Sequence, residues 1–247
     1  MKETFEPNAA AREVAQDQLL RENARLRGDL LTVATRISHD LRTPLGGIVS
    51  TAELLKEILT NQEPASAALA DSLFTSVDEM SKLISQIRTL AKATAEPKQK
   101  LPVQMATIVS GVLERLESRI LNRQATVAQP GSWPEVNGVA DWLEFIWWNL
   151  LTNALQHVGD QPRIELSWNQ EKNGICFQVR DNGAGVPVDM HAKLFQPFDT
   201  LHQPGSTCGL GLSVVQRLVD LQGGHCGYQS NSEGGADFYF TLPRAEK

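Results

Sequence analysis

Cysteine is scarce in this chain, and long apolar runs are missing from it. The three cysteines, Cys176, Cys208 and Cys226, stand far apart among 247 residues, and their spacing matches no structural zinc site. We expect all three to be buried, with Cys208 as a candidate reactive thiol because it would lie at a helix N-terminus. No apolar stretch approaches the ~18 residues of a membrane span, and residues 1–5 do not resemble a signal peptide.

Positive charge is also in short supply. The net charge of −6 argues against a general nucleic-acid binder, because such proteins carry basic surfaces. With 41% hydrophobic residues over 247 positions, the chain is long enough for two globular domains. Because the sequence has no apolar run of membrane-spanning length, we expect a cytoplasmic protein. Any attachment to a membrane is expected to come from a partner or from a missing upstream region.

The most informative segment is 38–45, which reads Ser-His-Asp-Leu-Arg-Thr-Pro-Leu. On a helix, His39 and Thr43 share one face, and Asp40 is offset by about 100°. Asp40 is placed to accept a hydrogen bond from one imidazole nitrogen, which raises the nucleophilicity of the other. Thr43 is placed to orient a water molecule. Taken alone, a solvated histidine beside an ordinary surface acid is the simpler interpretation.

An apolar repeat in steps of three and four precedes this segment, and it has one polar member, Asn23. Such a repeat is typical of the seam of a two-stranded coiled coil, in which a buried polar residue fixes the register at some cost in stability. A single amphipathic helix packed on its own domain is the alternative. The seam positions are Leu19, Asn23, Leu26, Leu30, Val33 and Ile37.

The helix is expected to continue beyond the histidine, with a local bend at Pro44. Proline removes one helical hydrogen bond, and Gly46 and Gly47 weaken the same point. A second helical pattern spans residues 64–95. Two antiparallel helices cannot bury a large core alone, so we expect a homodimer in which two hairpins form a four-helix bundle.

The periodicity changes after residue 95. Residues 96–102 contain two prolines and mixed charge, which indicates a linker. Beyond it, helical and strand patterns alternate, which predicts an α/β sandwich with a mixed sheet and helices on one face. The expected helices are 106–122, 140–158 and 208–222, and the expected strands are 125–129, 163–169, 174–180, 225–230 and 236–242.

Two glycine-rich clusters lie in this second region. Asp181 directly follows the predicted strand 174–180, and Gly183 and Gly185 come soon after it. An acceptor-only carboxylate suits an exocyclic amine such as that of adenine, and glycine permits close backbone approach; a glycine-rich turn capped by aspartate is the plain alternative. The second cluster, Gly209-Leu210-Gly211-Leu212, leads into a helix whose free amides fit a polyphosphate. It is not a Walker pattern, since no Gly-Lys-Ser/Thr follows.

A third cluster is polar. Asn149, Asn153 and His157 share one face of the predicted helix 140–158. Amides on an otherwise apolar helix are costly unless they bind something. Asparagine oxygens together with waters suit Mg²⁺, which would bridge phosphate oxygens.

Together these motifs resemble the transmitter half of a bacterial two-component sensor histidine kinase. The match covers about residues 30–243, and the motifs occur in family order: the phosphoacceptor box 38–45, the asparagine box 149–157, the first glycine box 181–186, the phenylalanine box 194–198 and the second glycine box 209–212. The resemblance implies four regions. They are an N-terminal coiled-coil helix (1–34), a dimerisation and phosphoacceptor domain (35–95), a linker (96–102) and a gyrase/MutL-like ATP-binding catalytic domain (103–247).

The resemblance also implies roles for individual residues. His39 would be phosphorylated by ATP and pass the phosphoryl group to an aspartate in the receiver domain of a response regulator. Asp40 would be the general base, and Thr43 would position water when the kinase acts as a phosphatase. Asn153 would hold Mg²⁺ with help from Asn149. Contacts to the nucleotide would further come from Asp181, Gly183, Gly185, Gly209, Leu210, Gly211 and Leu212.

Two features depart from the family pattern. Gln156 stands where a lysine usually neutralises phosphate, and the segment 199–208 contains no Lys or Arg. Fewer cations around the phosphates are expected to lower activity, because phosphoryl transfer depends on charge stabilisation. The alternative function is therefore a degenerate kinase that serves as a nucleotide-binding scaffold or allosteric partner. The input signal, in either case, is expected from a separate protein that docks on the N-terminal helix.

Overall fold

The computed structural model describes residues 9–59, 64–172, 174–196, 210–231 and 234–244. They fall into two compact units, Met1–Pro97 and Lys98–Lys247. Each unit has its own core and is described by itself.

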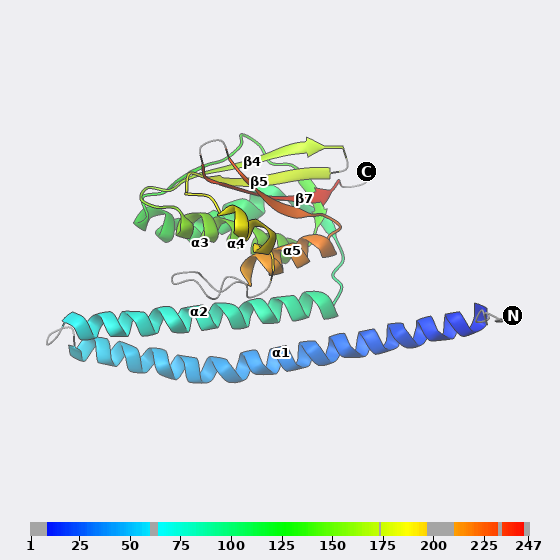
Figure 1. Ribbon diagram of the computed structural model, residues 1–247, viewed down its shortest axis with the longest axis horizontal. Helices are drawn as coiled ribbons and strands as arrows, with labels where there is room; N and C mark the ends of the chain where they lie inside the picture. Colours follow the sequence, from blue (N-terminus) through cyan, green and yellow to red (C-terminus); the bar gives the residue numbers. More distant parts are fainter. Residues whose placement is uncertain (1–8, 60–63, 173, 197–209, 232–233, 245–247) are drawn as a thin grey trace. The chain divides into compact units, whose positions relative to one another are not determined.

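The first unit is a helical hairpin of α1 (Ala9–Leu59) and α2 (Pro64–Ala95) (Figure 1). Its core contains Leu45, Val77 and Ile84, with Val49 packed against them. Small residues, among them Ala34, Ala52 and Ala91, are also buried, which lets the two backbones approach closely. The helix predicted at 64–95 is confirmed, and the first helix continues through Pro44 as expected.

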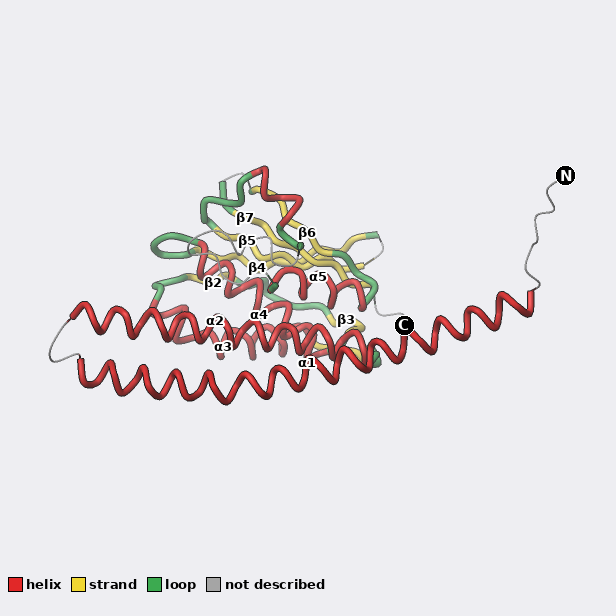
Figure 2. The backbone as a smooth tube through the Cα atoms, turned by 60° about the horizontal axis from the view of Figure 1, so that its bottom comes forward, coloured by secondary structure: helices red, strands yellow, loops and turns green. Residues whose placement is uncertain are grey.

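The second unit contains a five-stranded sheet in the order β2-β4-β5-β7-β6. Strand β2 runs parallel to β4, and the other neighbours are antiparallel, so the sheet is mixed as predicted. Figure 2 shows these strands side by side in a single layer. The strands are β2 (Thr126–Ala128), β4 (Arg163–Glu171), β5 (Gly174–Asp181), β6 (Cys226–Ser230) and β7 (Ala236–Pro243).

Helices α3 (Met105–Asn122), α4 (Ala140–His157) and α5 (Gly211–Leu221) lie on one face of this sheet (Figure 1). Between the layers, Trp147 meets Phe240 at 5.4 Å and Phe177 at 6.0 Å between ring centroids. All three aromatic side chains have a relative exposure of 0%. This aromatic cluster is the centre of the core, and the predicted architecture of helices on one face of a mixed sheet is confirmed.

The sequence interpretation missed a small second sheet. Strands β1 (Leu101–Gln104) and β3 (Glu135–Gly138) pair antiparallel, so residues 101–102 are part of a strand as well as the end of the expected linker. Both strands are four residues long, and β1 contains Pro102, so neither shows a clear alternation of polar and apolar residues. A 3₁₀ helix, η1 (Val188–Lys193), was also not predicted. Helix α5 begins at Gly211, three residues later than expected.

Candidate phosphoacceptor and nucleotide sites

Ser38 and His39 point in different directions from α1. Ser38 is buried at 3% exposure, and its hydroxyl donates to Ala34 O at 2.6 Å and lies 3.4 Å from Ile84 O of α2. Leu45, two turns further on, belongs to the hairpin core. Because successive residues differ by about 100° around a helix, burying Ser38 turns the next side chain away from that contact, and His39 is exposed. Its imidazole is therefore accessible on the surface of the hairpin.

The other predicted members of this site are Asp40 and Thr43. Asp40 and Thr43 lie on α1 between His39 and Leu45, but their side chains fall outside the described residues. Their proposed roles as base and water-positioning group stay predictions.

The polar row on α4 is partly buried. Asn149 has 7% exposure, and its Nδ2 donates to Phe145 O at 2.8 Å. This bond uses the amide nitrogen and leaves the carbonyl oxygen, the atom that a hard cation prefers, as the remaining polar atom of the side chain. Asn153 is half-buried one turn later, and His157 ends the helix. The donor set fits Mg²⁺.

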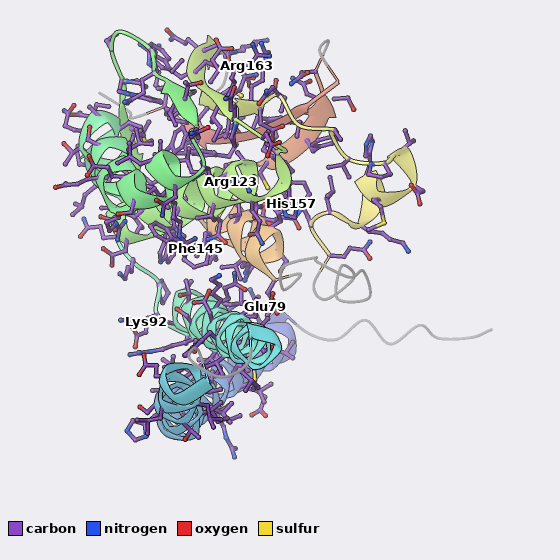
Figure 3. All side chains as sticks on the ribbon, turned by 90° about the vertical axis from the view of Figure 1, so that its left-hand side faces the viewer. Glu79, Lys92, Arg123, Phe145, His157 and Arg163 are labelled. Atoms are coloured by element: carbon purple, nitrogen blue, oxygen red, sulfur yellow. The ribbon has the colours of Figure 1, made fainter. Side chains whose placement is uncertain are left out.

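The C-terminus of α4 is fixed by a residue that the sequence interpretation missed. Arg123, just after α3, donates from Nη2 to Val158 O at 2.5 Å and to Gly159 O at 3.1 Å. The positive charge of the guanidinium also interacts favourably with the negative, C-terminal end of the helix dipole. Figure 3 labels Arg123 together with Phe145 and His157 of α4. An isolated arginine in a turn carries no sequence pattern that would have revealed this contact.

Asp181 ends β5 and is 7% exposed. Its Oδ1 accepts hydrogen bonds from Gly183 N at 2.8 Å and Ala236 N at 3.1 Å. Burial raises the pKa of Asp181, although the two backbone amides and the nearby His157 oppose this effect. The His157 side chain is partly exposed at the end of α4, and its partial burial lowers its pKa, against the attraction of the Asp181 carboxylate. Groups whose pKa values are displaced by burial and by each other are frequent at functional sites.

The ends of α4 and β5 meet at Gly183. A Cβ on Gly183 would lie 3.0 Å from Asp181 Oδ1, 3.1 Å from Val158 Cγ2 and 3.5 Å from His157 O. A Cβ at this position would therefore be tightly packed, and its neighbours would have to shift by a few tenths of an ångström to accept it. The structure thus brings together the end of the asparagine row and the first glycine cluster, which are far apart in sequence.

Gly185 adopts a left-handed backbone conformation, with φ of +69°. A Cβ there would lie 2.6 Å from Gly234 O, so a larger residue would be both strained and crowded. The next amide, Val186 N, donates to the hydroxyl of Tyr228 on β6 at 2.9 Å. The first glycine loop is therefore fastened to the strand pair β6–β7, and Tyr228 is a second contributor that the sequence did not reveal.

The second glycine cluster is described only in part. Gly209 lies outside the described residues. Leu210 is buried at 3% exposure, and Gly211 and Leu212 form the first turn of α5, both half-buried. Gln156, which departs from the family pattern, is exposed in the last turn of α4. The segment 199–208, including His202 and Cys208, is also outside the described residues.

The burial expected for the cysteines holds fully at one of the two that the structure describes. Cys176 is buried and Cys226 is half-buried. Burial raises the pKa of each thiol to about 12.

In the parts of the chain that the structure describes, no helix is both long enough and apolar enough to cross a membrane.

Comparisons with known protein families match a part of each unit. Residues 29–96 match the His Kinase A (phospho-acceptor) domain. Residues 138–246 match the histidine kinase-, DNA gyrase B- and HSP90-like ATPase family. The two matches place His39 in the first domain, and Asn149, Asn153 and Asp181 in the second.

Relatives with known names include the phytochrome-like protein Cph1 of Synechocystis, 29% identical over 230 residues that cover 92% of this chain and 31% of that protein. The alginate biosynthesis sensor protein KinB of Pseudomonas aeruginosa is 30% identical over 216 residues, 84% of this chain and 36% of that protein. The chain therefore spans about a third of the length of these relatives.

Solved structures give the same result. Full-length ShkA in complex with AMPPNP aligns with a TM-score of 0.65 and 26% identity over 87% of this chain and 46% of that one. The histidine kinase AdeS of Acinetobacter baumannii shares the fold, with a TM-score of 0.59 and 21% identity over 84% of this chain and 98% of that one. The chain belongs to the two-component histidine kinases and joins their phosphoacceptor domain to their ATP-binding domain.

Proposed function

We propose that the chain phosphorylates His39 from Mg-ATP and passes the phosphoryl group to an aspartate of a response regulator. In the first step a phosphorus–nitrogen bond forms at the imidazole, and the bond between the γ-phosphorus and the oxygen that bridges it to the β-phosphate breaks. ADP leaves, and Asp40 accepts the proton from the ring. The observation that carries the proposal is the exposed His39 beside the buried Ser38, on a chain that also contains an ATPase-like unit.

The second unit supplies the donor. The buried carboxylate of Asp181 accepts from the amino group of adenine, and Gly183 and Gly185 allow the backbone to approach the nucleotide. Gly209, Leu210, Gly211 and Leu212 are the residues that we expect to contact the phosphates, and Gly211 and Leu212 stand at the start of α5. Asn153, with Asn149, would hold Mg²⁺, which when bound neutralises phosphate charge.

The test uses γ-labelled ATP and Mg²⁺ with the full chain, followed by gel separation. Wild type and a variant with His225→Gln, which keeps the phosphoacceptor, are expected to be labelled, whereas His39→Ala is not. A phosphoramidate bond is broken by acid, so the label should disappear after brief acid treatment. Labelled His39→Ala, or acid-stable label on wild type, would contradict the proposal.

Transfer to a regulator and the reverse reaction are part of the same proposal. Thr43, one helical turn after His39, is suited to position the water that hydrolyses the regulator's phosphoaspartate. Labelled protein mixed with purified receiver domains should lose label to one of them within a short time. Thr43→Ala is expected to keep this transfer and to lose the phosphatase reaction, measured as the lifetime of the phosphorylated regulator.

A homodimer fits the surface of the hairpin. Four seam residues of α1 are exposed in the single chain: Leu19 at 71%, Leu26 at 58%, Leu30 at 52% and Ile37 at 49%. Exposed apolar residues along one seam, with Asn23 as its polar member, favour association with a second copy or with a helix of a separate sensor or regulatory protein. Light scattering should give a molar mass twice that of one chain, and Leu30→Lys should lower the measured mass toward that of a single chain.

The second candidate function is a scaffold or allosteric partner that binds nucleotide without effective transfer. It is favoured by Gln156, which leaves the exposed last turn of α4 without the cation that the family pattern supplies. His39→Ala separates the two functions in the cell. Loss of signalling supports phosphotransfer, and signalling that survives without the imidazole supports the scaffold.

A further inference from the structure

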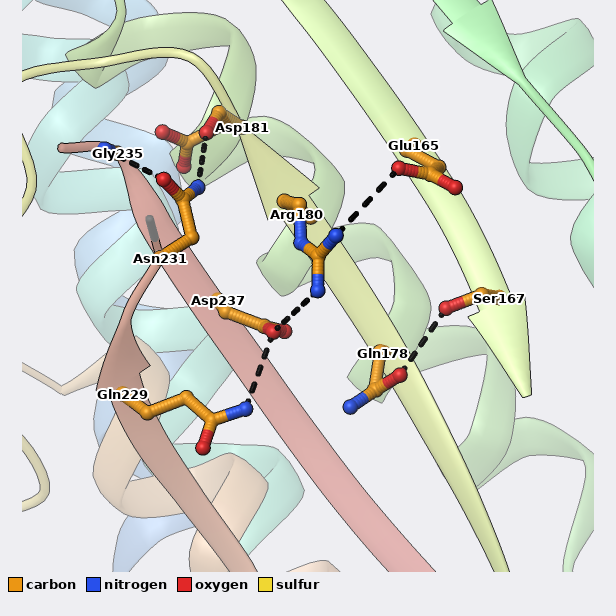
Figure 4. A network of polar contacts seen from close by, with 9 residues as sticks. All are labelled: Glu165, Ser167, Gln178, Arg180, Asp181, Gln229, Asn231, Gly235 and Asp237. Carbon is orange, nitrogen blue, oxygen red and sulfur yellow. Dashed lines mark hydrogen bonds and ion pairs between the residues drawn. The ribbon is translucent and has the colours of Figure 1, made fainter. Parts of the chain in front are cut away.

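The position of Asp181 depends on a residue outside every motif. Asp181 pairs with Ile164 of β4, but the ladder between β5 and β7 ends at Arg180 and Asp237, so Asp181 has no ladder partner in β7. Its backbone carbonyl accepts instead from Nδ2 of Asn231 at 2.8 Å, and Oδ1 of Asn231 accepts from Gly235 N at 2.9 Å. Figure 4 shows the amide between the two strands. We call these two bonds the Asn231 bridge.

The orientation of this amide is determined by its partners. The Asp181 carbonyl can only accept a hydrogen bond, and the Gly235 amide can only donate one, so a single orientation of the side chain satisfies both. Alanine would remove both bonds. Aspartate would keep the acceptor for Gly235 but would lose the donor to Asp181.

The Asn231 bridge controls both sides of the Asp181 carboxylate. It holds the Asp181 backbone directly, and it holds Gly235, whose neighbour Ala236 donates to Asp181 Oδ1 at 3.1 Å. The backbone at Gly235 approaches the backbone at Asp181 so closely that a Cβ on Gly235 would lie 2.0 Å from Asp181 O. The direction of the carboxylate is therefore set from the β6–β7 connection as well as from its own strand.

We propose that Asn231 is a positioning residue that sets the selectivity of the site for adenine over hypoxanthine bases. The inference rests on the proposed contact between Asp181 and the amino group of adenine. Hypoxanthine carries an oxygen at that position, which repels a carboxylate, so selectivity requires the carboxylate to be held in one direction. Without the bridge, Asp181 can turn or admit water, and the two bases are distinguished less well.

The experiment measures the dissociation constants of ADP and inosine diphosphate by calorimetry with the full chain and Mg²⁺. Wild type is expected to prefer ADP. Asn231→Ala and Asn231→Asp should each reduce this preference by about fivefold or more, corresponding to one hydrogen bond of ~1 kcal/mol. Asn231→Asp nearly keeps the size and the acceptor of asparagine, so it carries the test if the alanine variant does not fold.

Two reference variants make the result specific. Ser167→Ala removes another polar contact of the same sheet, the 3.1 Å bond to Gln178 Oε1 (Figure 4), and should keep the wild-type preference. Asp181→Asn should remove the preference altogether. If Asp181→Asn does so while both Asn231 variants keep it, or lose affinity for the two nucleotides equally, the inference is overturned and the proposed function stands. If wild type binds neither nucleotide, the proposed function fails.

Discussion

Asp181→Asn is expected to weaken nucleotide binding without weakening the fold. Asparagine keeps an Oδ1 that can accept from Gly183 N and Ala236 N, as the carboxylate does at 2.8 and 3.1 Å. It loses the negatively charged carboxylate oxygen that would accept a hydrogen bond from the amino group of adenine. A hydrogen bond to a charged group contributes about 1.5–3 kcal/mol, so the dissociation constant of ADP should rise roughly 10- to 150-fold.

The effect on stability has the opposite sign. Burial raises the pKa of Asp181 above its ordinary value of 3.8, so the folded state favours the protonated form. Its contribution to stability is therefore present below pH 3.8 and is lost as the pH rises through the higher folded pKa. At pH 7 the buried charge destabilises the second unit, and asparagine removes that charge.

The assay combines calorimetry with thermal unfolding at pH 7 and pH 4. The melting temperature of Asp181→Asn should be at least that of wild type at pH 7, and the difference should shrink toward pH 4. A variant that melts well below wild type would show that the carboxylate stabilises the fold. Unchanged affinity for ADP would show that Asp181 does not contact the base. Either result refutes the reasoning.

Three further predictions concern the second unit. Trp147→Ala should lower the free energy of unfolding by about 3–5 kcal/mol in a urea titration, because Trp147 is fully buried. The same substitution at the half-buried Trp148 should lower it by less. Cys176 and Cys226, whose pKa values are raised to about 12, should resist iodoacetamide at pH 7.5, and rapid labelling of either in mass spectra would contradict the burial. Gln156→Lys should raise the initial rate of autophosphorylation roughly three- to tenfold through added charge near the phosphates, and an unchanged rate would show that the position is remote from them.

Periodicity predicted the larger elements well. Within residues 64–95, apolar positions recur in steps of three and four from Leu69 to Ala91, and the helix spans Pro64–Ala95. The strand predicted at 174–180 is confirmed as β5, which ends at Asp181, one residue beyond the expected limit. Long elements with one buried face leave a pattern in the sequence because the core selects their side chains.

Short elements and polar contacts left no such pattern. Strands β1 and β3 have four residues each, too few for an alternation to be recognised. Asn231 and Tyr228 contact the first glycine loop only because the sheet order places β7 beside β5 and β6 beside β7. Their importance follows from register and from single hydrogen bonds, which depend on tertiary structure and not on local spacing.

The central claim is that the imidazole of His39 receives the phosphoryl group of the nucleotide that the second unit binds. The most direct measurement maps the phosphorylated residue by mass spectrometry under conditions that preserve phosphohistidine, after incubation with Mg-ATP. The same samples are titrated with ADP to measure nucleotide affinity. The account predicts phosphate on His39 in wild type, no phosphate in His39→Ala, and equal ADP affinity in both. Phosphate on another residue, or an unmodified wild type that binds ADP, would contradict it.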